Sequence, residues 1–281
     1  MSSKADKPVG TKASIDEKVG TRLWPLVLFL LALAGAGWLT TYFDAVCGLV
    51  LYVLVLFGLL AAASLRAEHP DHRFYLSMAL VPLIAIVSLS MPLEYFLELY
   101  RYLLISVPVL AAALVVIRIL RLSPAEIGLS FSRVLQVPLQ GLIGLTGAIF
   151  GLIGFWLLSP QPLIPTLSLE KVLPPALIFL VATGFTEELV FRGIIQRSSL
   201  EVMGTWGLVY TAAVFSTFYV GYLSWISWAW WGVVFVAGFF FGWITKQTGS
   251  IWGVSLADGL VNICLYLILP LLPLGFIPKL I

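Results

Sequence analysis

One segment of this sequence places two adjacent carboxylates and an arginine inside an otherwise apolar stretch. Residues 183–193 read TGFTEELVFRG and contain Glu187, Glu188 and Arg192. Ionisable side chains in a stretch long enough to cross a membrane are costly and usually functional. The i, i+4 spacing of Glu188 and Arg192 on a helix predicts an ion pair that neutralises both charges.

This pairing leaves Glu187 without a cation of its own. On an α-helix its side chain projects about 100° away from that of Glu188. A carboxylate without an ion-pair partner, in a site shielded from bulk solvent, can take a proton from a water molecule, so Glu187 is a candidate general base. The alternative is that both acids pair with groups on other helices and only hold a bundle together.

Two later apolar stretches carry polar side chains that can meet this segment. Residues 215–219 read FSTFY and end at Tyr219, whereas residues 258–262 read DGLVN and place Asp258 and Asn262 at i, i+4. A polar side chain in the middle of a span must face the bundle interior or water. We therefore expect these three side chains and Glu187 to line one cavity that opens to the cytoplasmic side.

The composition indicates that these stretches are membrane helices. Of 281 residues, 60% are hydrophobic and 11% charged, whereas charged residues make up about a quarter of a soluble domain. Candidate spans, judged by length and apolar content, are 23–43, 45–65, 74–91, 102–119, 137–158, 173–196, 206–222, 228–245 and 250–269. The sequence therefore predicts an all-α, polytopic transmembrane helical bundle with eight or nine spans.

The basic residues predict the orientation of these spans. With a cytoplasmic N-terminus, only Arg101, Lys171 and Lys279 of the 16 lysines and arginines fall outside, as the positive-inside rule requires. We expect an integral membrane protein of a prokaryotic plasma membrane.

The motifs resemble those of the CPBP family, which comprises CAAX prenyl endopeptidases and bacteriocin-processing, Abi-type proteins. The likeness covers about residues 120–270 and lies in Glu-Glu-x-x-x-Arg at Glu187, Glu188 and Arg192, Phe-x-x-x ending at Tyr219, and x-x-x-Asn ending at Asn262. The resemblance implies that Glu187 activates a water, that Glu188 and Arg192 support it, and that Asn262 stabilises an oxyanion. Together with the composition and the apolar spans, it predicts four regions: a disordered cytoplasmic tail at 1–21, which is low in apolar residues, N-terminal transmembrane helices at 22–119, the family-like protease core at 120–270 and a C-terminal tail at 271–281.

The chain departs from the family pattern at two positions, where Tyr219 and Asp258 stand in place of histidines. A tyrosine is not a base near neutral pH, and an ionised aspartate repels an oxyanion. A protonated Asp258 that donates to the oxyanion, or shares a proton with Glu187 as in acid proteases, is one way to retain activity. Since no span contains a histidine and carboxylates alone are unusual zinc ligands, we expect no metal and no cofactor.

The leading hypothesis is an intramembrane endopeptidase of the glutamic type that acts on a membrane-associated peptide or protein. The candidate catalytic residues are Glu187, Glu188, Arg192, Tyr219, Asp258 and Asn262. The alternative is a catalytically inactive family member that serves in binding, immunity or maturation. A transporter is a minor alternative, because no paired, interrupted half-spans are evident. The expected partners are membrane lipids and a membrane-bound or lipidated peptide substrate, and not nucleic acid.

Overall fold

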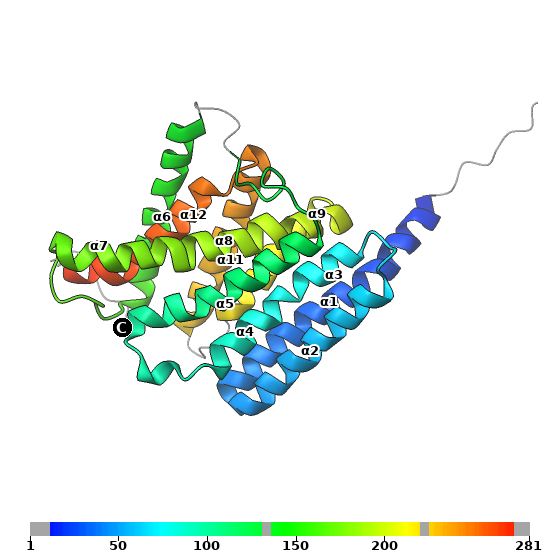
Figure 1. Cartoon of the computed structure of the whole chain (residues 1–281), viewed down its shortest axis with the longest axis horizontal. Coiled ribbons are helices and arrows are strands. Elements are labelled where there is room, and N and C mark those ends of the chain that lie inside the picture. Colours follow the sequence, from blue (N-terminus) through cyan, green and yellow to red (C-terminus); the bar gives the residue numbers. More distant parts are fainter. Residues whose placement is uncertain (1–11, 131–135, 220–224, 273–281) are drawn as a thin grey trace, which may run out of the picture.

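The protein consists of helices packed side by side (Figure 1). The computed structural model describes residues 12–130, 136–219 and 225–272. In chain order the elements are α1 (Lys12–Tyr42), α2 (Ala45–Leu65), α3 (His72–Met78), α4 (Leu80–Ser90), η1 (Leu93–Tyr95), α5 (Glu98–Ile119), α6 (Gln136–Leu158), α7 (Leu169–Ile178), η2 (Phe179–Phe185), α8 (Thr186–Glu188), η3 (Leu189–Ile195), α9 (Gln196–Met203), α10 (Trp206–Ser216), η4 (Thr217–Tyr219), α11 (Trp225–Thr248), α12 (Trp252–Ile263), η5 (Cys264–Ile268) and η6 (Leu269–Leu271).

Seven helices of the described residues are long and apolar enough to cross a membrane. They are Trp24–Tyr42, Ala45–Leu65, His72–Ser90, Glu98–Ile119, Val137–Leu158, Trp228–Thr248 and Trp252–Leu271. Each coincides with a predicted span. The predicted span 173–196 also falls on helices, within α7–α9. The predicted span 206–222 falls on α10 and η4 as far as Tyr219, and its last three residues lie outside the described residues. The polytopic all-helical bundle is therefore confirmed.

Helix α1 begins at Lys12, earlier than the predicted span 23–43. The part of the expected disordered tail from residue 12 onward is therefore helical. Its sequence contains good helix formers such as Ala13, Glu17 and Lys18, and adding residues to an existing helix is far easier than starting one. Residues 1–11 and 273–281, which hold the rest of the two expected tails, lie outside the described residues.

Glu187 and Glu188 lie on one continuous helix, called the acidic helix below. It runs from Leu169 to Met203 through α7, η2, α8, η3 and α9. The residues at the junctions, among them Phe179, Thr186 and Leu189, all keep right-handed helical backbone angles. Both η2 and η3 are π-helical and flank the short α8 that carries Glu187 and Glu188. Wide turns of this kind are frequent at functional sites. In Figure 1 this helix crosses the molecule.

Small residues let α12 approach the acidic helix closely. A Cβ added at Gly184 would meet the backbone oxygen of Ser255, and one added at Gly259 would meet Leu180. Glycine at such contacts is typical of membrane helices, whose association relies on close packing. Since α5 packs against η2 as well, the acidic helix lies between α5 and α12.

On its other side, α12 packs along α6. A Cβ added at Gly147 of α6 would meet the backbone carbonyl of Ala257, and one at Gly151 would meet Cys264 at 2.7 Å. Because Ala257 directly precedes Asp258, this contact fixes where the Asp258 backbone lies relative to α6.

The loop at residues 123–128 contacts both the end of the helix that carries Glu187 and Glu188 and the start of α12, which carries Asp258. The Ser123 N–H and hydroxyl donate to the Glu126 carboxylate at 2.8 and 2.9 Å, and these bonds hold the pKa of Glu126 below its usual value, with help from Arg197. Arg197 of α9 pairs with Glu126 at 2.8 Å. The Ile251 N–H, next to α12, donates to the Gly128 carbonyl at 3.1 Å.

The α6–α12 contact predicts a sharp difference between two glycines of α6. Gly147→Ala forces a methyl group into the Ala257 carbonyl and should lower the free energy of unfolding by about 1–3 kcal/mol, as overpacking does. Gly141 has no neighbour within 4 Å, so Gly141→Ala is the matched control and should melt like the parent. Thermal unfolding in detergent measures both, and equal melting temperatures would contradict the described contact.

Candidate functional site

The predicted ion pair is present at the centre of the acidic helix. Arg192 Nη1 lies 3.1 Å from Glu188 Oε1, and the two side chains are 1% and 0% exposed. A buried charge is tolerated only when it is paired. Glu188 is therefore committed to Arg192.

Helices α11 and α10 provide further contacts to Arg192 and to Gln196 on the acidic helix. Arg192 Nη2 donates to the Gly238 carbonyl at 3.4 Å, and Gln196 Nε2 donates to the Gly242 carbonyl at 2.9 Å. The Arg192 guanidinium also lies 4.6 Å from the centre of the Phe215 ring, within the range of a cation–π contact. These contacts fix Arg192 and, through it, Glu188.

Glu187 has different surroundings from its neighbour. It is half-buried and lines a cavity of about 350 Å³ to which Tyr102, Thr183 and Tyr219 also contribute. No lysine or arginine is among the described residues that line this cavity. Glu187 is thus a carboxylate beside open space without a cation dedicated to it, as the sequence predicted.

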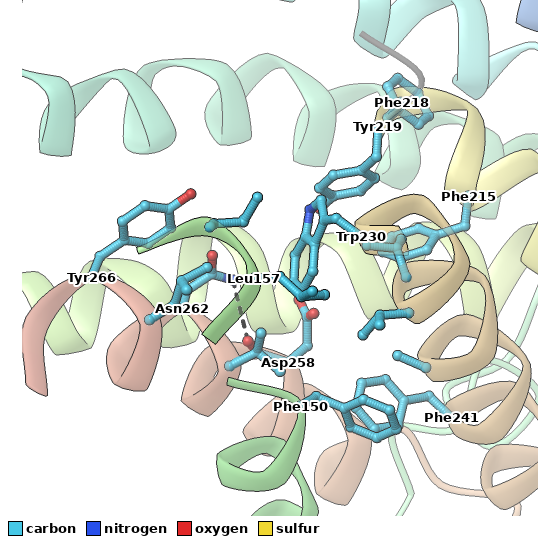
Figure 2. A pocket seen from close by; sticks show the side chains of 16 residues that line it. Phe150, Leu157, Phe215, Phe218, Tyr219, Trp230, Phe241, Asp258, Asn262 and Tyr266 are labelled. Carbon is cyan, nitrogen blue, oxygen red and sulfur yellow. Dashed lines mark hydrogen bonds between the residues drawn. The ribbon is translucent and has the colours of Figure 1, made fainter. Parts of the chain in front are cut away.

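Asp258, Asn262 and Tyr219 line a second cavity of about 530 Å³ (Figure 2). Its walls are otherwise mainly apolar, with aromatic rings such as Phe150 and Trp230. Asp258 is 8% exposed, and its Oδ2 has no hydrogen-bond partner among the described residues. This cavity therefore combines an apolar interior with a few polar groups, the usual character of a small-molecule or chain-binding site.

The expectation of one common cavity is only partly correct. Glu187 lines the first cavity, Asp258 and Asn262 line the second, and Tyr219 lines both. Phe215 and Phe218 also line both cavities, so the segment that ends at Tyr219 is shared between them. Residue spacing in the sequence cannot indicate that the segment ending at Tyr219 separates two cavities.

The two cavities are nevertheless linked. Asn262 Nδ2 donates at 3.2 Å to Thr183 Oγ1, which lies on the Glu187 helix, and at 3.2 Å to the Asp258 carbonyl. The second bond is visible in Figure 2. Both amide hydrogens of Asn262 are therefore engaged.

The candidate residues did not include several polar residues that line these cavities, among them Tyr102, Thr183 and Tyr266. Thr183 stands four residues before Glu187 and Tyr266 four residues after Asn262, so helical spacing could have indicated both. Tyr102 lies on α5, where no motif marks it. As for metals, no group of three or more His, Cys, Asp or Glu side chains in the described part of the chain could hold an ion.

Comparison with known protein families gives a match, which covers about a third of the chain. Residues 169–264 match the model of the type II CAAX prenyl endopeptidase Rce1-like family. No curated protein and no solved structure matches the chain. The matched range lies within the predicted core at 120–270 and contains all six candidate residues, so the resemblance is confirmed over this range.

The buried ion pair predicts a large effect of breaking it from one side. Arg192→Ala leaves Glu188 buried without a partner and should lower the free energy of unfolding by about 3–5 kcal/mol. The double variant Glu188→Gln, Arg192→Met removes both charges and should recover part of that loss. Thermal unfolding in detergent measures each variant, and an Arg192→Ala protein that melts like the parent would show that the pair contributes nothing.

Proposed function

We propose that this chain, which carries a type II CAAX prenyl endopeptidase Rce1-like domain at residues 169–264, is an intramembrane endopeptidase of the glutamic type. The observation that carries the proposal is the contrast between two adjacent acids. Glu188 is paired with Arg192 at 3.1 Å, whereas Glu187 lines a cavity beside Tyr219 and Thr183. One acid is used for structure and the other is available for chemistry.

In this mechanism Glu187 is the general base and then the general acid. Its carboxylate takes a proton from a water molecule while the water oxygen attacks the carbonyl carbon of the peptide bond, and the carbonyl π electrons move to oxygen. Protonated Glu187 then gives its proton to the leaving nitrogen as the C–N bond breaks. The products are a carboxylic acid and an amine, and Glu187 returns to its starting state.

The oxyanion formed in this reaction needs hydrogen-bond donors. Tyr219 lines both cavities and is the residue with a hydroxyl that the two linings share. Asp258 can donate only when protonated, and its Oδ2 has no hydrogen-bond partner among the described residues. Asn262 can donate only by releasing Thr183 or the Asp258 carbonyl.

The substrate in this proposal is a membrane-bound or lipidated peptide. The 530 Å³ cavity has a mainly apolar lining with Asp258 and Asn262 in its wall, which suits an apolar chain attached to a peptide. The matching family takes its name from prenylated CAAX sequences. We place the protein in a prokaryotic plasma membrane with its N-terminus in the cytoplasm, because basic residues concentrate on that side.

A second candidate is a catalytically inactive family member that binds a membrane peptide. Tyr219 and Asp258 at the positions of the family's histidines favour it. The contacts that hold Arg192 and Asn262 would persist in such a protein, because they support the fold.

The proposed base predicts the outcome of one conservative substitution. Glu187→Gln keeps the size of the side chain and removes the base, so cleavage should fall by about 10²–10⁴-fold while the melting temperature is kept. The assay is cleavage of a farnesylated peptide with a CAAX terminus by protein reconstituted in phosphatidylcholine vesicles. Glu170→Gln, at the exposed start of the same helix, is the matched control. Cleavage that survives Glu187→Gln unchanged would contradict the proposal.

The two candidate functions differ in their response to histidines. The variant Tyr219→His, Asp258→His places the family's residues beside Glu187 and should raise the rate of cleavage in the same assay. Activity that appears only in this variant, with none in the parent, would favour the inactive binding protein. A parent that cleaves while the double variant does not would favour a mechanism adapted to tyrosine and aspartate.

A further inference from the structure

Thr183 is a buried polar residue of the acidic helix to which the mechanism above gives no role. It is 3% exposed and stands four residues before Glu187. Its Oγ1 donates to the Phe179 carbonyl at 2.7 Å and lies 3.2 Å from Asn262 Nδ2. Through the second of these bonds the acidic helix contacts the Asn262 side chain, which lines the second cavity.

The chemistry of its two partners fixes which way round the Asn262 amide lies. A hydroxyl carries one hydrogen, and a backbone carbonyl can only accept. Because the Thr183 hydrogen goes to the Phe179 carbonyl, Thr183 can only accept from Asn262. The Asp258 carbonyl, 3.2 Å from Asn262 Nδ2 (Figure 2), also can only accept. Both partners therefore require the NH₂ end of the amide, and a flipped amide would place its oxygen against two acceptors.

This orientation decides what Asn262 can offer to a ligand. Both hydrogens of its amide go to protein acceptors, so the remaining polar atom of the side chain is Oδ1, which is an acceptor. Asn262 is partly exposed and lines the second cavity. A molecule in that cavity thus meets Asn262 as an acceptor, whereas an oxyanion needs a donor.

A peptide supplies a donor that suits this acceptor, namely the N–H of its backbone. An apolar chain attached to the peptide has no such group. The four residues of helix between Thr183 and Glu187 span about 6 Å, which is about the length of two extended residues. An N–H held by Asn262, which is bonded to Thr183, therefore lies about two residues along the substrate from a peptide bond at Glu187.

We propose that Thr183 is a positioning residue for Asn262, which it holds so that Oδ1 accepts a hydrogen bond from a backbone N–H of the substrate about two residues from the bond at Glu187. The inference deepens the proposed function, on which it rests for its peptide substrate. It gives Asn262 the role of an acceptor for the peptide, opposite to the oxyanion donor that the family motif implies.

The test compares a farnesylated CAAX peptide with ester analogues of it. Each analogue has an ester in place of one amide within two residues of the cleaved bond, which itself stays an amide, so each lacks one N–H. Binding to the Glu187→Gln protein in phosphatidylcholine vesicles is measured by competition with a fluorescent farnesylated CAAX peptide, with protein-free vesicles as the blank. One analogue should bind about five- to tenfold more weakly than the peptide, as the loss of one hydrogen bond predicts. Asn262→Leu, made in the same protein, should abolish this preference.

Substitutions of Thr183 test the positioning role separately. Thr183→Val keeps the shape of the side chain and removes the acceptor, so the Asn262 amide is released and the preference should fall to about twofold or less. Thr183→Ser retains the hydroxyl and should retain the preference. Thr146→Val is the matched control, because the Thr146 hydroxyl donates to the Ile143 carbonyl of its own helix at 2.6 Å and lines neither cavity. It should bind the peptide and the analogues like the parent.

The outcomes separate the inference from the function. Equal binding of the peptide and all analogues, or a preference that survives Asn262→Leu, would overturn the acceptor role. A preference that survives Thr183→Val would show that Thr183 only packs. A parent that shows the preference and yet cleaves no peptide would overturn the endopeptidase function alone, and a protein that binds no peptide would overturn both.

Discussion

The ion pair between Glu188 and Arg192 is the constraint on which the rest of the structure depends. An arginine inside an apolar bundle must be neutralised and its remaining donors satisfied, because the surrounding lipid and side chains offer neither. Glu188 provides the charge, the Gly238 carbonyl accepts a hydrogen bond, and the Phe215 ring covers the guanidinium. These partners bring α10 and α11 against the acidic helix, and the same contacts place the segment that ends at Tyr219.

Arg192 pairs with Glu188, whereas Glu187 lies beside open space. The cavity that Glu187 lines draws on more than the family-matched range. Ser88, Tyr102 and Ser106 of α4 and α5 line it, although they precede residues 169–264. The second cavity is formed by α6, α10, η4, α11, α12 and η5. The two cavities are joined through Tyr219 and through the bond from Asn262 to Thr183. The N-terminal helices therefore contribute directly to the candidate site.

Local spacing predicted what lies within one helix, and it could not predict what depends on distant packing. The pair of Glu188 with Arg192 follows from the i, i+4 rule, and the spans follow from apolar length. The division into two cavities depends on where Phe215, Phe218 and Tyr219 meet the other helices, which no periodicity records. The π-helical turns were missed because the sequence gives no distinct signal for them, and they change which residues share a face. The span 23–43 was predicted correctly, but the helical residues of α1 before it were not, because their low apolar content was taken to indicate disorder.

The i, i+4 geometry of the ion pair also matters while the chain is being synthesised. An arginine at the centre of a helix that enters the bilayer through the translocon costs about 2.5–3.5 kcal/mol. The Phe215 ring and the Gly238 carbonyl come later in the chain, so their helices enter the bilayer after this one. Glu188 belongs to the same turn as Arg192 and is present from the start. The helix can thus enter the lipid with its arginine already neutralised and remain there until α10 and α11 arrive.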